Sequence, residues 1–238
     1  MVPRSPREAS GQPAIKGLLV SRALLVEVKR DIENQVRGLL KNFGLVNGRA
    51  KMNTFTRRAE ELIDGNPALT ASTGPLLNAR ETIAQQIADL DRKVLRLARS
   101  DAQVRCLMTA PGIGAITGLC YLATIDDPIR FNKSRKVGAY VALTTRRFAS
   151  GGVDWTGRLS KCGDAMLRSY LYEAANVLLT RGQGWSTLKA WGVRLAKRIG
   201  FRKAKVAVAR KLAVILHRMW IDGTDFQWTS KETAEQPA

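Results

Sequence analysis

Apolar residues recur with helical spacing along two long segments of the chain. Between residues 14 and 43 they fall seven positions apart at Leu18, Leu25, Ile32 and Leu39, with Val36 and Phe43 beside them. The same spacing returns at Leu76, Ile83, Leu90 and Leu97, with Ile87 and Val94 between them. Each segment predicts a long amphipathic helix. Thr73 and Pro75 predict the start of the second helix, because Thr caps free amides and Pro suits the first helical turn.

The two long helices have two ways of burying their apolar stripes. They can pair with each other as an antiparallel hairpin, or they can pair with a partner chain as a coiled coil. Seam spacing specifies pairing but does not distinguish these arrangements. Either one predicts a helical region over residues 14–101, and the second predicts a homo-oligomer.

Shorter amphipathic segments, separated by Gly, Pro and Asp, predict further helices in the rest of the chain. They cover residues 50–63, 101–110, 115–125, 134–141, 163–182, 186–199 and 203–221, with an extended or looped stretch over 142–159. The predicted fold class is mainly α. It comprises a disordered leader (1–13), long antiparallel coiled-coil helices (14–101), a compact basic helical domain (102–221) and a disordered tail (222–238).

Positive charge is concentrated in one part of the chain. The formal net charge is +19, and residues 128–221 hold 20 Lys and Arg against 3 Asp and Glu. A face with so few acids predicts attraction to a phosphate polyanion. The longest nearly apolar run, Ile113 to Ile125, is too short to span a bilayer, so we expect a nucleic-acid partner, no membrane and a cytoplasmic location.

The residues that bind metals in proteins are sparse here. Cys106, Cys120 and Cys162 share no CxxC spacing, and His217 is the single histidine, so zinc is not expected. His217 has apolar neighbours and is interpreted as a packing residue. The carboxylates form no metal-binding set, and no nucleotide-binding loop is present, so no metal and no nucleotide cofactor are predicted for this chain.

The turn Pro111-Gly112-Ile113-Gly114 between two predicted helices has two interpretations. Glycines at a helix start leave backbone amides free to donate to a DNA phosphate, as in the helix-hairpin-helix motif. Gly112 and Gly114 are therefore candidate nucleic-acid contacts. The same glycines also suit a sharp turn between packed helices, and spacing alone favours neither interpretation.

Ser150 lies in a stretch rich in glycine and in cations. A serine can attack phosphorus if its oxygen is exposed and nearby charges stabilise the charge that develops. The cations that could do so are Arg146, Arg147, Arg158 and Lys161. From the residues alone, Ser150 is more typical of a turn, and its neighbours of a loop that clamps phosphate.

Several motifs in order resemble the C-terminal domain of the IS-one-ten family of insertion-sequence transposases, also called DEDD transposases. They are APGIGAITGL (110–119), DPIRF (127–131), GAYVAL (138–143), SGG (150–152) and GRLSKCG (157–163). They span about a third of the chain, and NQVRGLLKNFG (34–44) extends the resemblance into the first predicted helix.

The resemblance implies a bacterial recombinase that cuts and rejoins DNA, guided in some members by an RNA that the element encodes. In the family, a serine of this domain is thought to link covalently to DNA, and the matching residue is Ser150. Arg146, Arg147, Arg158 and Lys161 become expected DNA contacts, and Arg168 on the following predicted helix is added to them. The family's Asp-Glu-Asp-Asp magnesium site belongs to an N-terminal RuvC-like domain.

This chain begins where the family's coiled-coil region begins, so we expect the RuvC-like domain to be absent. The hypothesis is a truncated transposase that folds, dimerises and binds nucleic acid but does not catalyse transposition alone. Two alternatives stay open: a non-catalytic DNA- or RNA-binding helical module, and a regulator that dimerises with a full-length transposase.

Overall fold

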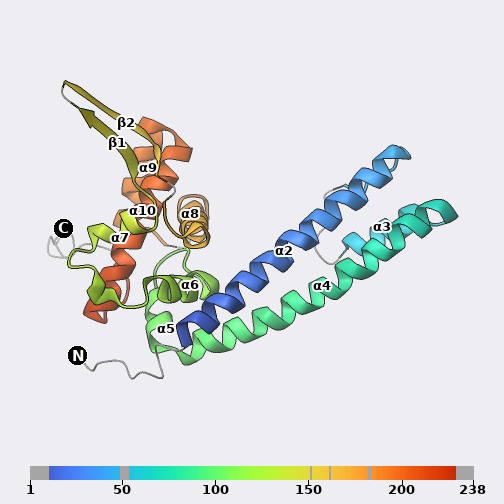
Figure 1. The fold of residues 1–238 in the computed structure, drawn as a ribbon, viewed down its shortest axis with the longest axis horizontal. Helices are drawn as coiled ribbons and strands as arrows, with labels where there is room; N and C mark the ends of the chain where they lie inside the picture. The colour runs from blue at the N-terminus through green and yellow to red at the C-terminus, as the bar shows by residue number, and fades with distance from the viewer. Residues whose placement is uncertain (1–10, 49–53, 151, 161, 182–183, 229–238) are drawn as a thin grey trace, which may run out of the picture. The chain divides into compact units, whose positions relative to one another are not determined.

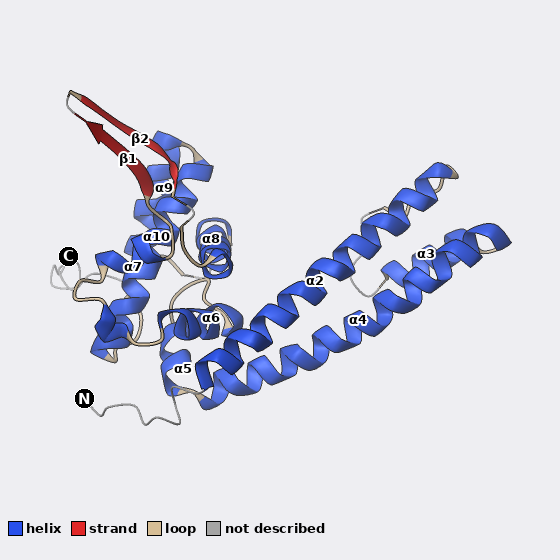
Figure 2. Cartoon of the chain, viewed as in Figure 1, coloured by secondary structure: helices blue, strands red, loops and turns tan. Residues whose placement is uncertain are grey.

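The computed structural model describes residues 11–48, 54–150, 152–160, 162–181 and 184–228. These residues are mainly helical, which confirms the predicted fold class, and they include one two-stranded sheet (Figures 1 and 2). The elements are α2 (Gly11–Asn42), α3 (Phe55–Ile63), α4 (Pro67–Ser100), α5 (Ala102–Met108), α6 (Ala115–Ile125), the 3₁₀ helix η1 (Pro128–Arg130), α7 (Arg135–Tyr140), β1 (Thr145–Ser150), β2 (Val153–Leu159), α8 (Ala165–Thr180), α9 (Thr187–Ile199) and α10 (Phe201–Asp222).

The chain divides into two compact units. The N-terminal unit is Gly17–Val94, and the C-terminal unit is Leu95–Ala238 together with the chain up to Lys16. The boundary therefore falls inside α2 and inside α4.

In the N-terminal unit, ion pairs join α2 to α4. Arg22 pairs with Asp91, and the Nε of Arg80 lies 3.0 Å from the Oε1 of Glu33. Because the earlier residue of α2 pairs with the later residue of α4, the two helices run antiparallel. The predicted seam residues Leu25 and Ile83 are only half-buried, so the coiled coil stays a prediction. The buried apolar cluster of this unit is made by Val36, Leu40, Phe55, Ala59, Ile63, Leu69 and Leu77.

Helix α4 begins earlier than the sequence analysis predicted. Thr73 and Pro75 lie inside the helix instead of at its start, and Thr73 is fully buried. The side chain of Asn66 accepts a hydrogen bond from the Leu69 amide at 3.1 Å, and Pro67 is the first helical residue. The helix therefore starts with the same two signals that the prediction relied on, a capping side chain followed by proline, but they are supplied by Asn66 and Pro67.

In the C-terminal unit, α10 packs against α8, α9 and α7. The fully buried Tyr121 of α6 donates its hydroxyl to the Ala213 carbonyl of α10 at 2.7 Å, and burial raises the pKa of this phenol. His217 is also fully buried, with Nε2 2.9 Å from the Pro128 carbonyl and Nδ1 3.0 Å from the Ser134 hydroxyl. This imidazole ties η1 and the start of α7 to α10, which agrees with its interpretation as a packing residue.

Both predicted disordered ends differ from the structure where it describes them. Helix α2 begins at Gly11, inside the expected leader. Beyond α10, Phe226 is buried, and its amide donates to the Thr109 hydroxyl at 2.9 Å. The Trp228 carbonyl accepts the Thr187 amide at 3.1 Å. These hydrogen bonds and the buried ring order residues 223–228, whereas 1–10 and 229–238 lie outside the described residues.

Strands β1 and β2 form an antiparallel hairpin within the stretch predicted as extended or looped. The hairpin extends away from the helices of the C-terminal unit (Figure 1). Phe148 is paired with Trp155, and Ser150 with Val153. The register is irregular between Thr145 and Arg147, near the end of the hairpin where the strands meet the helices.

Candidate nucleic-acid interface

Ser150 is the last residue of β1 and lies at the far end of the hairpin. Its side chain is exposed, as an attacking oxygen must be. No hydrogen bond of its hydroxyl is seen among the described residues. Gly152 begins the return of the chain after Ser150, and Gly151 lies outside the described residues.

Of the four cations predicted to surround Ser150, the structure describes the side chain of Arg146 alone. Arg146 donates from Nη2 to the Ser160 carbonyl at 3.1 Å, near the base of the hairpin. Four residues of strand separate it from Ser150, a rise of about 14 Å, so the structure does not bring these two side chains together. The side chains of Arg147 and Arg158, and the whole of Lys161, lie outside the described residues.

Arg168 is placed on α8, away from the hairpin's far end. Its side chain is half-buried, and Nη1 is buried with no hydrogen-bond partner among the described residues. Its assignment as a nucleic-acid contact stays a prediction.

The turn before α6 is packed against α8. Gly112 has a φ of +80°, and a Cβ built there would lie 2.4 Å from the Ala174 carbonyl oxygen. Only glycine combines this backbone conformation with so close an approach. The geometry of Gly112 thus supports the packing interpretation. Gly114 differs, because it is the N-cap of α6, with no capping side chain and open space where a Cβ would be.

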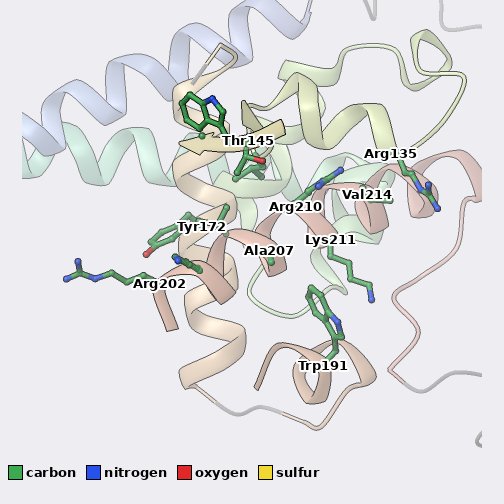
Figure 3. Close-up of a pocket in the computed structure, with 14 residues that line it drawn as sticks. Arg135, Thr145, Tyr172, Trp191, Arg202, Ala207, Arg210, Lys211 and Val214 are labelled. Carbon is green, nitrogen blue, oxygen red and sulfur yellow. The ribbon is translucent and has the colours of Figure 1, made fainter. Parts of the chain in front are cut away.

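A large open pocket, here called the basic pocket, lies between the base of the hairpin and α7, α8, α9 and α10 (Figure 3). Its volume is about 1230 Å³. It is lined by Arg135, Leu143, Thr145, Trp155, Gly157, Tyr172, Trp191, Arg202, Lys203, Val206, Ala207, Arg210, Lys211 and Val214. Among these described residues, five are cationic and none is acidic, so the pocket is complementary to phosphate.

Aromatic rings alternate with the cations of the basic pocket. The Nζ of Lys211 lies 4.5 Å from the centre of the Trp191 ring, and the two side chains approach one another in Figure 3. Next to the pocket, the Nζ of Lys205 lies 4.4 Å from the centre of the Tyr172 ring. Cations and flat apolar surfaces together match the phosphates and bases of a nucleic acid.

Helix α10 supplies both the unit's core and one wall of the basic pocket. Val208, Leu212 and Leu216 are fully buried. Lys203, Arg210 and Lys211 lie on the other side and line the pocket. Arg210 and Lys211 follow Lys203 by seven and eight residues, two helical turns, which keeps all three on one side of the helix. The sequence predicted an amphipathic helix over residues 203–221 inside the basic segment, but none of these three cations was named as a site residue. Arg135 and Trp191 were missed too, because four separate helices and the hairpin assemble this surface.

At the start of α8, Asp164 joins two parts of the C-terminal unit. Its carboxylate accepts the Leu167 amide at 2.7 Å, as an N-cap does, and pairs with Lys16 of α2. Partial burial alone would raise the pKa of this carboxyl. The Leu167 amide and the Lys16 ammonium outweigh that effect and hold the pKa below its usual value.

The three cysteines are free. Burial raises the pKa of the Cys120 thiol to about 11, so this thiol is protonated at neutral pH. In the described part of the chain, no group of three or more His, Cys, Asp or Glu side chains could hold a metal ion. No described helix is long and apolar enough to cross a membrane.

Residues 104–190, which include the turn, the hairpin and the whole of α8, match the family described as Transposase IS116/IS110/IS902 family. The predicted resemblance to these insertion-sequence transposases is confirmed. The match contains Ser150 and part of the basic pocket, but it ends before α10, which provides the pocket's Arg210 and Lys211.

Individual transposases are similar to the chain well beyond that domain. The transposase for insertion sequence element IS1111A of Coxiella burnetii is 29% identical over 210 residues, which is 86% of this chain and 58% of that protein. The "Probable family 20 transposase" of Pseudomonas aeruginosa is 30% identical over 217 residues, 89% of this chain and 64% of that protein. The transposase for element IS1328 of Yersinia enterocolitica is 28% identical over 218 residues, covering 90% and 65%. The chain thus spans about three fifths of the length of these relatives.

Proposed function

We propose that this chain is the part of an insertion-sequence transposase that holds DNA and transfers its strand, with the basic pocket as the DNA-binding surface. One observation carries the proposal. Five cations and three large aromatic side chains line a single open pocket in which no described residue is acidic. The similarity to transposases supports DNA as the polyanion.

Salt-dependent binding tests the basic pocket. Replacing Arg210 and Lys211 together by Gln removes two cations from it. The affinity for duplex DNA should fall about tenfold at physiological salt. The slope of log K against log salt should flatten by about 1.8, because binding releases about 0.9 counterions for each phosphate contact and two contacts are lost. The measurement is fluorescence anisotropy of a labelled duplex across a salt series.

The matched control removes the same charge elsewhere. Lys93 and Arg96 are exposed on α4 and do not line the basic pocket. The variant with both replaced by Gln should retain the affinity and slope of the wild-type chain. Equal losses in the two double variants would show that net charge alone attracts DNA, and would refute the pocket as the binding surface.

We further propose that Ser150 is the nucleophile. Two observations support this: its side chain is exposed at the far end of the hairpin, and it lies within the region that matches the transposase family. Its oxygen would bond to phosphorus while the bond from phosphorus to a deoxyribose oxygen breaks. The departing oxygen takes up a proton, the serine loses one, and the strand is held as a phosphoserine ester. The reverse attack rejoins it, so the exchange needs no oxidant or reductant.

Covalent trapping tests Ser150. The chain is supplied with a RuvC-like partner, with its magnesium, and with labelled DNA, and denaturing gels then report any attached strand. Wild-type chain should be labelled and Ser150→Ala should not. Ser169→Ala is the control, because this exposed hydroxyl lies on α8 and donates to the Ala165 carbonyl of its own helix. Label on Ser150→Ala would remove Ser150 from this role, leaving a DNA-binding module.

A guide RNA and a homo-oligomer are separate proposals. The basic pocket would also accept RNA phosphates, and competition between an element-encoded RNA and duplex DNA for the wild-type chain tests this. The half-buried seam residues of α2 and α4 favour self-association, which would also allow regulation of a full-length relative. Sedimentation of the purified chain should then give a mass above that of one 26.2 kDa copy.

A further inference from the structure

Two aromatic rings are stacked in the open on the hairpin. The centres of the Phe148 and Trp155 rings are 4.3 Å apart, and the ring planes are inclined by 15°. Phe148 is 45% exposed and Trp155 is 54% exposed. Neither ring is covered by the helical core, so the pair presents a flat apolar surface to a ligand.

The stacked pair shares a strand face with Ser150. Phe148 and Ser150 are two residues apart on β1, and Trp155 is the cross-strand partner of Phe148, so all three side chains leave the same side of the hairpin. Two residues of strand rise by about 6.8 Å. That distance is about two base steps along a DNA strand, at about 3.4 Å each.

The same pair borders the basic pocket. Trp155 lines that pocket together with Tyr172 and Arg210. Gly157 makes room for the rings, because a Cβ there would lie 3.1 Å from Cε2 of Phe148 and 3.3 Å from Cζ3 of Trp155. Cations, stacked rings and the Ser150 hydroxyl therefore follow one another along a single surface of the C-terminal unit.

We propose that the Phe148–Trp155 pair stacks against an unpaired base of the DNA and thereby positions the neighbouring phosphodiester at Ser150. The inference rests on the proposed function and adds the state of its substrate: DNA with unpaired nucleotides beside the reactive phosphate. Bases inside a duplex are covered by their neighbours, so only an unpaired or terminal base can meet an aromatic face. The ring pair accepts any base, and the phosphates of the same strand lead into the basic pocket.

The cationic surroundings favour a nucleic acid over a second copy of the chain as the occupant. Arg210 and its neighbours would face the same charges on a copy, whereas a DNA strand brings one phosphate for each nucleotide. Phe148 and Trp155 act here as positioning residues, since Ser150 alone would form the bond.

Two matched substrates test the proposal. One is a blunt duplex, and the other is the same duplex with a stretch of about four unpaired nucleotides, the smallest site size of proteins that stack single strands. The wild-type chain should bind the second more tightly. Trp155→Ala should lose most of that preference, about fivefold or more in the ratio of the two affinities.

The controls separate stacking from other roles of Trp155. Trp155→Phe keeps a stacking ring and should retain the preference, and Phe148→Ala should lose it. Trp185→Ala removes a tryptophan that is 66% exposed and does not line the basic pocket, and it should behave as wild type. Circular dichroism of each variant should match the wild-type spectrum, because both rings are exposed.

The outcomes distinguish this inference from the proposed function. A wild-type chain that binds neither substrate would refute the proposed function itself. Binding of both substrates with equal affinity, or a preference that survives Trp155→Ala and Phe148→Ala, would overturn only the stacking role. Loss of self-association in Trp155→Ala with an unchanged preference would also overturn it, and would assign the rings to contact between copies.

Discussion

The turn at Pro111–Gly114 and the basic pocket are two candidate phosphate sites built in opposite ways. At the turn, Gly112 lies against the backbone of α8, and the missing side chain lets two helices approach. In the pocket, long cationic side chains of α10 border open space. A glycine-rich sequence can thus serve packing, while the proposed binding surface lies on a helix face that carries no recognisable motif.

The largest expected effect is on stability, and it differs between the two glycines of the turn. Gly112→Ala should lower the free energy of unfolding by about 3 kcal/mol, since alanine must adopt a positive φ and its Cβ would clash with the Ala174 carbonyl. Urea denaturation measures this. Gly114→Ala meets open space and should stay within about 1 kcal/mol of wild type. If Gly114→Ala keeps its stability but weakens DNA binding, the turn is a phosphate site after all.

A smaller effect concerns the helix against which the turn packs. Asp164→Asn keeps a capping oxygen on α8 but removes the charge that pairs with Lys16, and should cost about 1 kcal/mol at neutral pH. Because the pKa of this carboxyl is lower in the folded state, its stabilisation is complete above the unfolded pKa of about 3.9. The difference from wild type should shrink as the pH falls through the folded pKa. A difference that is constant with pH would exclude the charge as its cause.

The smallest expected effect is on binding alone. A Cβ at Gly138 would lie 2.9 Å from Cγ of Arg210, so Gly138→Ala should displace this side chain from its place in the basic pocket. We expect about a threefold loss of DNA affinity with little change in stability, measured by anisotropy and urea denaturation. In an Arg210→Gln background the substitution should have no further effect. Additive losses would show that Gly138 acts elsewhere.

The sequence predicted most helices because their apolar stripes are local and continuous, as in Ala165–Thr180. It misplaced the start of α4 because Asn66-Pro67 and Thr73-Pro75 carry the same capping signal, and burial of Thr73 decides between them. The motif around Ser150 was found by resemblance, but the strand pairing that places Phe148 beside Trp155 is a tertiary result. The basic pocket could not be predicted because its residues come from separate elements, although the spacing of Lys203, Arg210 and Lys211 was a readable signal.

The pairing register of the hairpin shifts between Thr145 and Arg147, before the strand reaches Phe148 and Ser150. An irregularity of this kind bends and twists a strand locally, and the residues beyond it keep their alternation. Inserting or deleting one residue at that point would turn Phe148 and Ser150 to the opposite side together, since side chains alternate with a period of two. Relatives that differ in length by one residue here would thus offer the rings and the hydroxyl as a unit to a differently placed strand.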